Sequence, residues 1–222
     1  QRLWGGDEST VNLIPAPLYH GAACNFAVGT IANGGTVVFM RKFDALQALQ
    51  AIDTYKVTHS QWVPTMFSRM LKLPDEQKNA LDLSSHEVAI HAASPCPKPL
   101  KRKMFEWWGE IIYEYYGGTE GSGFTHVSPQ EWLKYPGTVG CSITASEIRI
   151  CDDAGTVLPS GEIGQIYFAQ PEQDGSFQYY KESEKTKNSQ HPQHANWSTL
   201  GDIGYVNEEG YLFLTDRSSF MI

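Results

Sequence analysis

The chain has 222 residues, a mass of 24.8 kDa, 41% hydrophobic residues and a formal charge of −8. This composition is that of a globular protein with a buried core, which excludes wholesale disorder, and the negative charge excludes a nucleic acid as a favourable partner. Residues 1–136 carry a net charge of −1, from 12 basic and 13 acidic residues, whereas residues 137–222 carry −7, from 5 basic and 12 acidic residues. We therefore expect two subdomains with different surfaces.

The first 136 residues alternate predicted strands with predicted helices. Short apolar runs predict strands within residues 11–19, 35–40, 59–63, 87–93 and 111–116, and helical spacing predicts helices at 44–57, from Pro64 to Pro74, and at 97–108. Asp44 is the expected N-cap of the first of these helices. Alternating strands and helices are typical of an α/β fold with a mainly parallel sheet, whose ligands bind where strand C-termini lead into loops.

Residues 137–213 follow a different pattern. Short predicted strands at 147–151, 163–168 and 211–214 are separated by turns rich in Gly, Pro, Asn and Asp, which favours antiparallel hairpins. We expect a smaller β-rich subdomain with the form of a distorted barrel. Residues 181–196 are polar and lack periodicity, so they are expected to form a solvated loop.

The cysteines and the hydropathy pattern predict a soluble, cytoplasmic protein. Cys24, Cys96, Cys141 and Cys151 form neither a C-x-x-C pair nor a metal-ligand spacing, so we expect buried, reduced thiols. No apolar run reaches the roughly 18 residues of a membrane span, and no signal peptide opens the chain. Because the chain begins with Gln1 and ends just after a predicted strand, we expect an internal fragment of a longer protein.

The glycine-rich segment 115–123 follows a predicted strand and is the most informative motif. Its glycines let backbone N–H groups approach a ligand, the hydroxyl of Thr119 can donate to a phosphate, and the carboxylate of Glu120 can hold Mg²⁺. The segment fits a nucleoside phosphate, but a glycine-rich turn without a ligand fits the same pattern. It matches neither of the common phosphate-binding glycine motifs.

Asp202 and His20 each allow a functional interpretation and a structural one. Asp202, in the segment 197–202, offers a carboxylate that could accept both hydroxyls of a ribose, although an Asp beside Gly is also typical of a turn. His20 follows a predicted strand, where it is either structural or catalytic.

Three groups of side chains also keep a structural interpretation beside a functional one. A basic run on one predicted helix could meet the phosphates of coenzyme A or form a solvated face, and an apolar helical stripe could line an acyl tunnel or belong to the core. Two histidines in the polar loop would need further ligands to hold a metal. The basic run is Lys98, Lys101, Arg102 and Lys103. The apolar stripe is Met66, Phe67 and Met70, and the two histidines are His191 and His194.

Taken in order, nine segments resemble the adenylate-forming superfamily, specifically the acyl-CoA synthetases or fatty-acid–CoA ligases. The resemblance covers essentially the whole chain. The segments are PLYHGA at 17–22, WVPTMF at 62–67, HAASPCP at 91–97, YYGGTEG at 115–121, YPGTVG at 135–140, PSGEIGQIYF at 159–168, YYKESEKT at 179–186, WSTLGD at 197–202 and GYLFLTDR at 210–217.

The resemblance implies a reaction and a set of site residues. In this family a carboxylic acid attacks ATP to give an acyl-adenylate and pyrophosphate, and the thiol of coenzyme A then displaces AMP. The resemblance implies that Thr119, in the loop that contains Gly117 and Gly118, contacts the α-phosphate and that Glu120 holds Mg²⁺. It implies that adenine is enclosed by Tyr116 and by the backbone of Ala92, Ala93 and Ser94. It also implies that Asp202 and Arg217 bind the ribose and that His20 borders the acyl carboxylate.

The chain also departs from the family pattern. The Ser/Thr/Gly-rich phosphate loop and the small C-terminal domain with its catalytic lysine are absent from the sequence, so we expect the isolated chain to be inactive. Residues 1–136 would be the α/β subdomain, 137–213 the β-rich subdomain, and 214–222 the start of a hinge. Ser219 and Phe220 stand where many members carry charged residues, so a hinge role cannot be transferred to Phe220.

Three functions remain open on the sequence alone. The first is an acyl-CoA ligase for a carboxylic acid, with a fatty acid as the expected substrate. The second is an adenylate-forming enzyme that transfers an aryl or amino acid to another acceptor. The third is a catalytically silent nucleotide-binding fragment.

Overall fold

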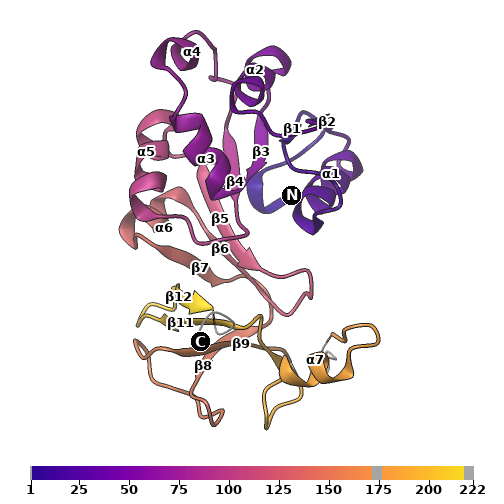
Figure 1. Cartoon of the computed structure of the whole chain (residues 1–222), viewed down its shortest axis with the longest axis vertical. Helices are drawn as coiled ribbons and strands as arrows, with labels where there is room; N and C mark the ends of the chain where they lie inside the picture. Colours follow the sequence, from indigo (N-terminus) through magenta and orange to yellow (C-terminus); the bar gives the residue numbers. More distant parts are fainter. Residues whose placement is uncertain (1, 172–176, 218–222) are drawn as a thin grey trace. The chain divides into compact units, whose positions relative to one another are not determined.

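The computed structural model describes residues 2–171 and 177–217 (Figure 1). The chain divides into two compact units, Gln1–Tyr113 and Glu114–Ile222, and each is described by itself. The boundary after residue 136, which was inferred from composition and charge, stays a prediction.

The first unit contains a parallel sheet, as the alternating pattern predicts. A 3₁₀ turn, η1 (Arg2–Trp4), precedes it. Four strands lie in the order β2-β1-β3-β4, and every neighbouring pair is parallel. The strands are β1 (Val11–Ile14), β2 (Thr36–Phe39), β3 (His59–Trp62) and β4 (Val88–His91).

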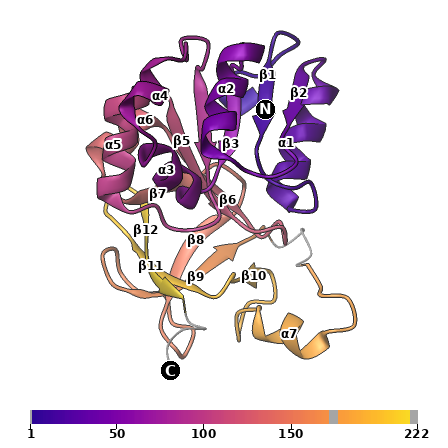
Figure 2. The same ribbon diagram turned by 45° about the horizontal axis from the view of Figure 1, so that its top comes forward.

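Helices cover both faces of this sheet (Figure 2). Successive strand residues point to opposite faces. The side-chain amide of Asn12 donates to Thr30 Oγ1, 2.9 Å away in α1, whereas Leu13 belongs to the core formed by α2 and α3. The helices are α1 (Gly21–Ala32), α2 (Ala45–Tyr55), α3 (Pro64–Leu71), α4 (Asp75–Asn79) and α5 (Lys98–Trp108).

Local signals mark the starts of two helices correctly. The carboxylate of Asp44 accepts a hydrogen bond from the backbone N–H of Gln47, so Asp44 is the N-cap of α2. Pro64 begins α3, where its missing N–H costs nothing.

The main core confirms one structural interpretation and corrects another. Met66, Phe67 and Met70 are buried core residues. Lys101, expected on a solvated face, is fully buried, and its ammonium lies 6.0 Å from the ring centroid of Phe105. It occupies the core-facing stripe of α5 with Met104, so its apolar stem packs inside the unit.

The second unit is β-rich, as predicted, and its strand pairs are antiparallel. Its strand order is β10-β9-β11-β12-β7-β6-β5, and β8 also pairs with β9. Among the described residues this sheet does not close, so the expected distorted barrel is corrected to an open sheet. The strands are β5 (Ile112–Gly117), β6 (Phe124–Val127), β7 (Thr138–Ser142), β8 (Glu147–Cys151), β9 (Gly164–Ala169), β10 (Trp197–Ser198), β11 (Asp202–Val206) and β12 (Leu212–Arg217).

Two short helices complete the second unit. In α6 (Pro129–Lys134), Ser128 and Glu131 form a reciprocal capping box. The second helix, α7 (Ser183–Asn188), lies inside the segment expected to be a solvated loop. That expectation was wrong at His191 as well, because this ring is buried and its Nε2 lies 2.8 Å from the carbonyl oxygen of Gly155. Six helical residues are too few to show a period in the sequence.

The four cysteines are free thiols, but only Cys151 is buried, and Cys24 is exposed. Within the described ranges, no helix is long and apolar enough to cross a membrane. Residues 214–217 extend β12, whereas Ser219 and Phe220 lie outside the described residues.

Candidate functional site

The glycine-rich loop lies between the antiparallel strands β5 and β6, and Gly117 and Phe124 are paired at its ends. A side chain at Gly118 would collide with the carboxylate of Glu120 and with Leu200, and one at Gly123 would enter the ring of Phe168. Glycine is therefore required where this loop approaches its neighbours closely. In this loop Thr119 is exposed and Glu120 is partly buried.

The carboxylate of Glu120 is held by a tyrosine from a distant motif. The hydroxyl of Tyr179 donates to Oε1 of Glu120 at 2.8 Å. Burial raises the pKa of Tyr179 to about 12, and its bond to Glu120 adds to this effect. The backbone N–H of Tyr179 donates to Thr186 Oγ1 at 2.9 Å, so α7 holds the backbone at this tyrosine. The sequence analysis identified the segment 179–186 as one of the nine family segments, but it did not predict the contact between Tyr179 and Glu120.

A second group of predicted residues comes together at the start of β11. The hydroxyl of Tyr116 donates to Oδ2 of Asp202 at 2.8 Å, and its ring stacks on Phe168 with centroids 5.8 Å apart. Asp202 is 5% exposed and is the first residue of β11, not a turn residue. In the antiparallel ladder Asp202 is paired with Arg217 of β12. The side chains of Tyr116 and Asp202 thus meet within one unit, and the backbone of Arg217 is paired with that of Asp202.

The two groups are neighbours through the glycine-rich loop. The close approach of Gly118 to Leu200 places the loop against the segment that leads into Asp202. The second unit therefore presents a backbone loop, a hydroxyl at Thr119 and the carboxylates of Glu120 and Asp202. Such donors and acceptors can bind a phosphate, a hard cation and a ribose.

The remaining predicted residues lie in the first unit. His20 follows β1 and Ala92–Ser94 follow β4, and parallel strands place their carboxyl ends at one edge of the sheet. His20 is exposed, caps α1 without a side-chain hydrogen bond, and contacts the Tyr19 ring at 4.4 Å between centroids. His20 and Ala92–Ser94 are therefore related by the edge of the sheet that they share.

Ala93 has an unusual backbone conformation. Its φ is +78°, which L-residues with a side chain rarely adopt and which costs about 1–3 kcal/mol. Ala93 and Ser94 are exposed and lie just after the buried end of β4. No sequence signal marks the conformation of Ala93, because alanine is not a residue that favours positive φ.

The side chains that could bind a metal ion do not form a large cluster in the part of the chain that the structure describes. Within residues 2–171 and 177–217, no group of three or more His, Cys, Asp and Glu side chains could hold a metal ion. A magnesium ion, which proteins commonly bind through one or two carboxylates and a phosphate, needs no such group. The single carboxylate of Glu120 fits that mode.

Comparison with known proteins identifies the family. The model of the AMP-binding enzyme family matches residues 1–180. The chain belongs to this family, and the resemblance inferred from the nine segments is confirmed.

Similar proteins include CoA ligases. The chain is 32% identical to 4-coumarate--CoA ligase-like 3 of Arabidopsis thaliana, over 99% of this chain and 39% of that protein. It is 28% identical to a long-chain-fatty-acid--CoA ligase of Bacillus subtilis, over 98% of this chain and 38% of that protein. Its fold matches the amide bond synthetase McbA from Marinactinospora thermotolerans with a TM-score of 0.84 and 26% identity, over 97% of this chain and 42% of that one. The chain thus spans about two fifths of the length of these proteins.

Proposed function

We propose that the chain is the central part of an ATP-dependent acyl-CoA ligase. The whole enzyme would join a carboxylic acid to the α-phosphate of ATP, release pyrophosphate, and transfer the acyl group from the adenylate to the thiol of coenzyme A. Family membership and the two CoA ligases among the relatives support this proposal.

The observation that carries the proposal is the hydrogen bond from Tyr116 to Asp202 beside the glycine-rich loop, at the point where the backbone of Asp202 is paired with that of Arg217. A buried carboxylate with one oxygen held by a phenol is oriented before any ligand arrives. We assign Asp202 and Arg217 to the ribose and Tyr116 to the edge of adenine. Gly117, Gly118 and Thr119 would receive the α-phosphate, and we assign the backbone of Ala92, Ala93 and Ser94 to adenine as well.

We assign Mg²⁺ to Glu120 in the same proposal. When bound, the ion neutralises charge that develops on the phosphates during adenylate formation. The chain's own contribution is to fix the carboxylate, through the hydroxyl of Tyr179 and the close packing around Gly118. Preorganised charged groups of this kind typically account for about 100-fold or more in rate each.

The acid is proposed to be a fatty acid, with His20 bordering its carboxylate. The exposed imidazole of His20 at the carboxyl edge of the parallel sheet supports this placement. A fatty-acid ligase among the relatives supports the acid class, whereas the 4-coumarate ligase-like relative favours an aryl acid. The similarity to an amide bond synthetase favours a second candidate function, in which an amine replaces coenzyme A as acceptor.

A pyrophosphate-release assay on a longer protein that contains this chain tests the proposal. Fatty, aryl and amino acids are supplied one at a time, with ATP, Mg²⁺ and either coenzyme A or an amine as acceptor. We expect release to require a fatty acid and the acyl group to appear on coenzyme A. Transfer only to an amine would favour the second candidate, and no release with any acid would leave a silent nucleotide-binding protein.

The 222-residue chain by itself serves as the comparison in that assay. We expect it to release pyrophosphate at least about 100-fold more slowly, because groups that orient the phosphates are not among its residues. An equal rate would contradict this part of the proposal.

A further inference from the structure

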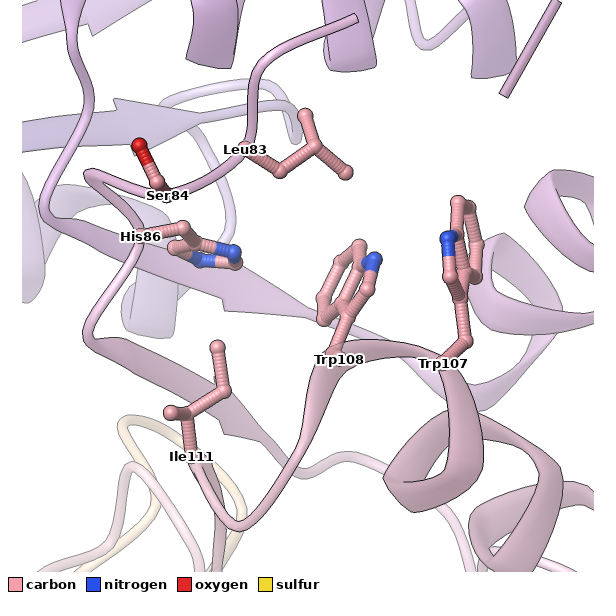
Figure 3. Close-up of a pocket in the computed structure, with 6 residues that line it drawn as sticks. All are labelled: Leu83, Ser84, His86, Trp107, Trp108 and Ile111. Carbon is pink, nitrogen blue, oxygen red and sulfur yellow. The ribbon is translucent and has the colours of Figure 1, made fainter. Parts of the chain in front are cut away.

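A cavity of about 200 Å³ lies in the first unit (Figure 3). The lining residues are Leu83, Ser84, His86, Trp107, Trp108 and Ile111. Nδ1 of His86 and Nε1 of Trp108 have no hydrogen-bond partner, but both atoms are buried in the wall. Figure 3 shows the Trp108 nitrogen on the edge that faces Trp107 and not His86. The two nitrogens therefore do not meet on one ligand atom, and we assign no ligand to the cavity.

The second unit contains a contact that the proposed function does not use. Gln170 directly follows β9, and its side-chain Nε2 donates to the carbonyl oxygen of Ser122 and, at 3.3 Å, to that of Gly121. A side-chain amide carries two N–H hydrogens, so one glutamine can serve both carbonyls of the glycine-rich loop. Because both partners are acceptors, the atom that faces them must be the nitrogen.

The carbonyl of Gly121 lies at the end of the turn that carries Thr119 and Glu120. The N–H of Gly121 donates to the carbonyl oxygen of Gly118 at 3.3 Å, which closes a turn with Thr119 and Glu120 at its centre. Among the described residues, no atom lies within 4 Å of the place that a Cβ on Gly121 would take. Hydrogen bonds, and not packing, therefore hold this end of the turn.

A second donor acts further from the turn. The hydroxyl of Ser146 donates to the carbonyl oxygen of Ser122 at 3.0 Å. Gln170 reaches this carbonyl as well, but it also reaches Gly121, which is one residue nearer to Glu120. Gln170 is thus the side chain that connects the sheet to the closing residue of the turn.

The backbone of Gln170 is itself fixed. Its N–H donates to the carbonyl oxygen of Asn196 at 3.1 Å, and Nδ2 of Asn196 donates to the carbonyl oxygen of Gln170. The two residues extend the antiparallel pair of β9 and β10, in which Ala169 is paired with Trp197. The amide that holds the loop therefore projects from a strand end with little freedom.

We propose that Gln170 is a positioning residue for the phosphate-binding turn. It would act through Gly121 and hold the turn in the conformation that receives the α-phosphate, without touching the nucleotide. This inference rests on the proposed function, which assigns the α-phosphate to Gly117, Gly118 and Thr119. A loop that is ordered before the ligand arrives binds it without the cost of ordering the backbone.

Gln170→Met, in a longer protein that contains this chain, tests the proposal. The substitution keeps the length of the side chain and removes the amide. We expect the backbone amides of residues 117–124 to exchange hydrogen about fivefold faster, which corresponds to the net value of one hydrogen bond. Hydrogen exchange followed by mass spectrometry measures this change and needs no nucleotide.

Calorimetric titration with AMP and with adenosine measures the effect on the phosphate. The preference of the protein for AMP over adenosine should fall about fivefold in Gln170→Met. The affinity for adenosine should change less than twofold, because the contact between Tyr116 and Asp202 is intact. A general loss of structure would instead weaken both ligands alike.

Gln165→Met is the matched control. Gln165 lies in the same strand, but its amide donates to Oγ1 of Thr199 at 3.2 Å and not to the loop. This variant should leave both the exchange of residues 117–124 and the preference for AMP unchanged. Gln170→Asn keeps the amide and shortens the side chain by one bond, about 1.5 Å, so it should loosen the loop as Gln170→Met does. It decides the question where Gln170→Met does not fold.

Unchanged exchange of residues 117–124 in a folded Gln170 variant would overturn the inference. Faster exchange with a full preference for AMP would overturn it as well, because the turn would then not serve the phosphate. A wild type that binds AMP no more tightly than adenosine would overturn both the phosphate site and the role of Gln170 in it. The wild-type titration therefore distinguishes a failure of the proposed function from a failure of this inference alone.

Discussion

The hydroxyl of Tyr116 donates a 2.8 Å hydrogen bond to Oδ2 of Asp202, which lies 86 residues further along the chain. The bond connects the end of β5, just before the glycine-rich loop, to the first residue of β11. Tyr116 and Asp202 were expected to contact a nucleotide separately, through adenine and ribose. Their direct bond means that the tyrosine also positions the carboxylate.

Tyr116→Phe tests this positioning role. The variant keeps the ring that stacks on Phe168 and removes only the hydroxyl. Because the carboxylate stays in place but is less well oriented, we expect AMP binding to weaken about fivefold, which is close to the net value of one hydrogen bond. Calorimetric titration with AMP measures the change. Tyr205→Phe, in the same strand as Asp202, is the control and should bind AMP as the wild type does.

Glu120→Gln, in the longer protein, tests the proposed magnesium ligand. The substitution keeps the size of the side chain and removes its charge. Adenylate formation should fall about 100-fold or more, whereas coenzyme A transfer from a supplied acyl-adenylate should fall much less, since the metal serves the first half-reaction. Rapid-quench measurement of each half-reaction separates the two. Equal losses in both would point to a damaged fold, and Glu208→Gln, at an exposed position, controls for loss of one negative charge.

Tyr179→Phe tests whether the phenol that holds Glu120 affects the metal. The carboxylate would lose its 2.8 Å bond and gain freedom. We expect the Mg²⁺ concentration for half-maximal adenylate formation to rise about threefold to tenfold, with little change in the KM for the acid. Tyr180→Phe is a close control, because the neighbouring tyrosine is 85% exposed. The same shift in both variants would argue against a specific role for Tyr179.

The sequence predicted those features of the fold that depend on neighbouring residues, such as where several helices begin or end. Asp44, Pro64 and Gly109 mark helix ends by their own chemistry, so the start of α2, the start of α3 and the end of α5 were placed correctly, whereas α3 ends at Leu71 and not at Pro74. It missed α1 as a defined helix because Val28 and Ile31 are exposed there, which blurs the apolar stripe. The bond between Tyr179 and Glu120 spans 59 residues, so no local pattern could show it. The cavity at His86 depends likewise on the tertiary packing of two tryptophans.

The buried His86 predicts a pH dependence of stability. Its pKa is lowered from 6.5 to about 3 by burial, so between these values the unfolded chain binds a proton that the folded chain does not. The contribution of the neutral His86 ring to the free energy of unfolding is therefore fully present above pH 6.5 and is lost as the pH falls from 6.5 toward 3. From pH 7 to pH 5 this group alone should lower the free energy of unfolding by about 2 kcal/mol.

Urea unfolding at pH 5, 6 and 7 measures this effect. His86→Gln cannot titrate and should lose about 2 kcal/mol less than the wild type over that range. The control is His194→Gln, at an exposed position, which should follow the wild type. An identical pH dependence for the wild type and His86→Gln would refute the assignment of the effect to His86.

The last prediction concerns Asp202→Ala. A hydrogen bond to a charged group contributes about 1.5–3 kcal/mol, so losing two to the ribose hydroxyls would cost about 3–6 kcal/mol if they were additive. Water can enter the vacated space, so we expect the lower end, which is about a 100-fold weaker affinity for AMP. Calorimetry with AMP and 2′,3′-dideoxy-AMP distinguishes ribose binding from a general loss of stability. The wild type should strongly prefer AMP, and the variant should hardly distinguish the two ligands.

A double variant, Tyr116→Phe/Asp202→Ala, is the control, because Asp202→Ala also removes the acceptor for the hydroxyl of Tyr116. If the double variant binds AMP as Asp202→Ala does, the loss of affinity comes from the carboxylate. A variant that keeps the full wild-type preference for AMP would show that Asp202 does not bind the ribose.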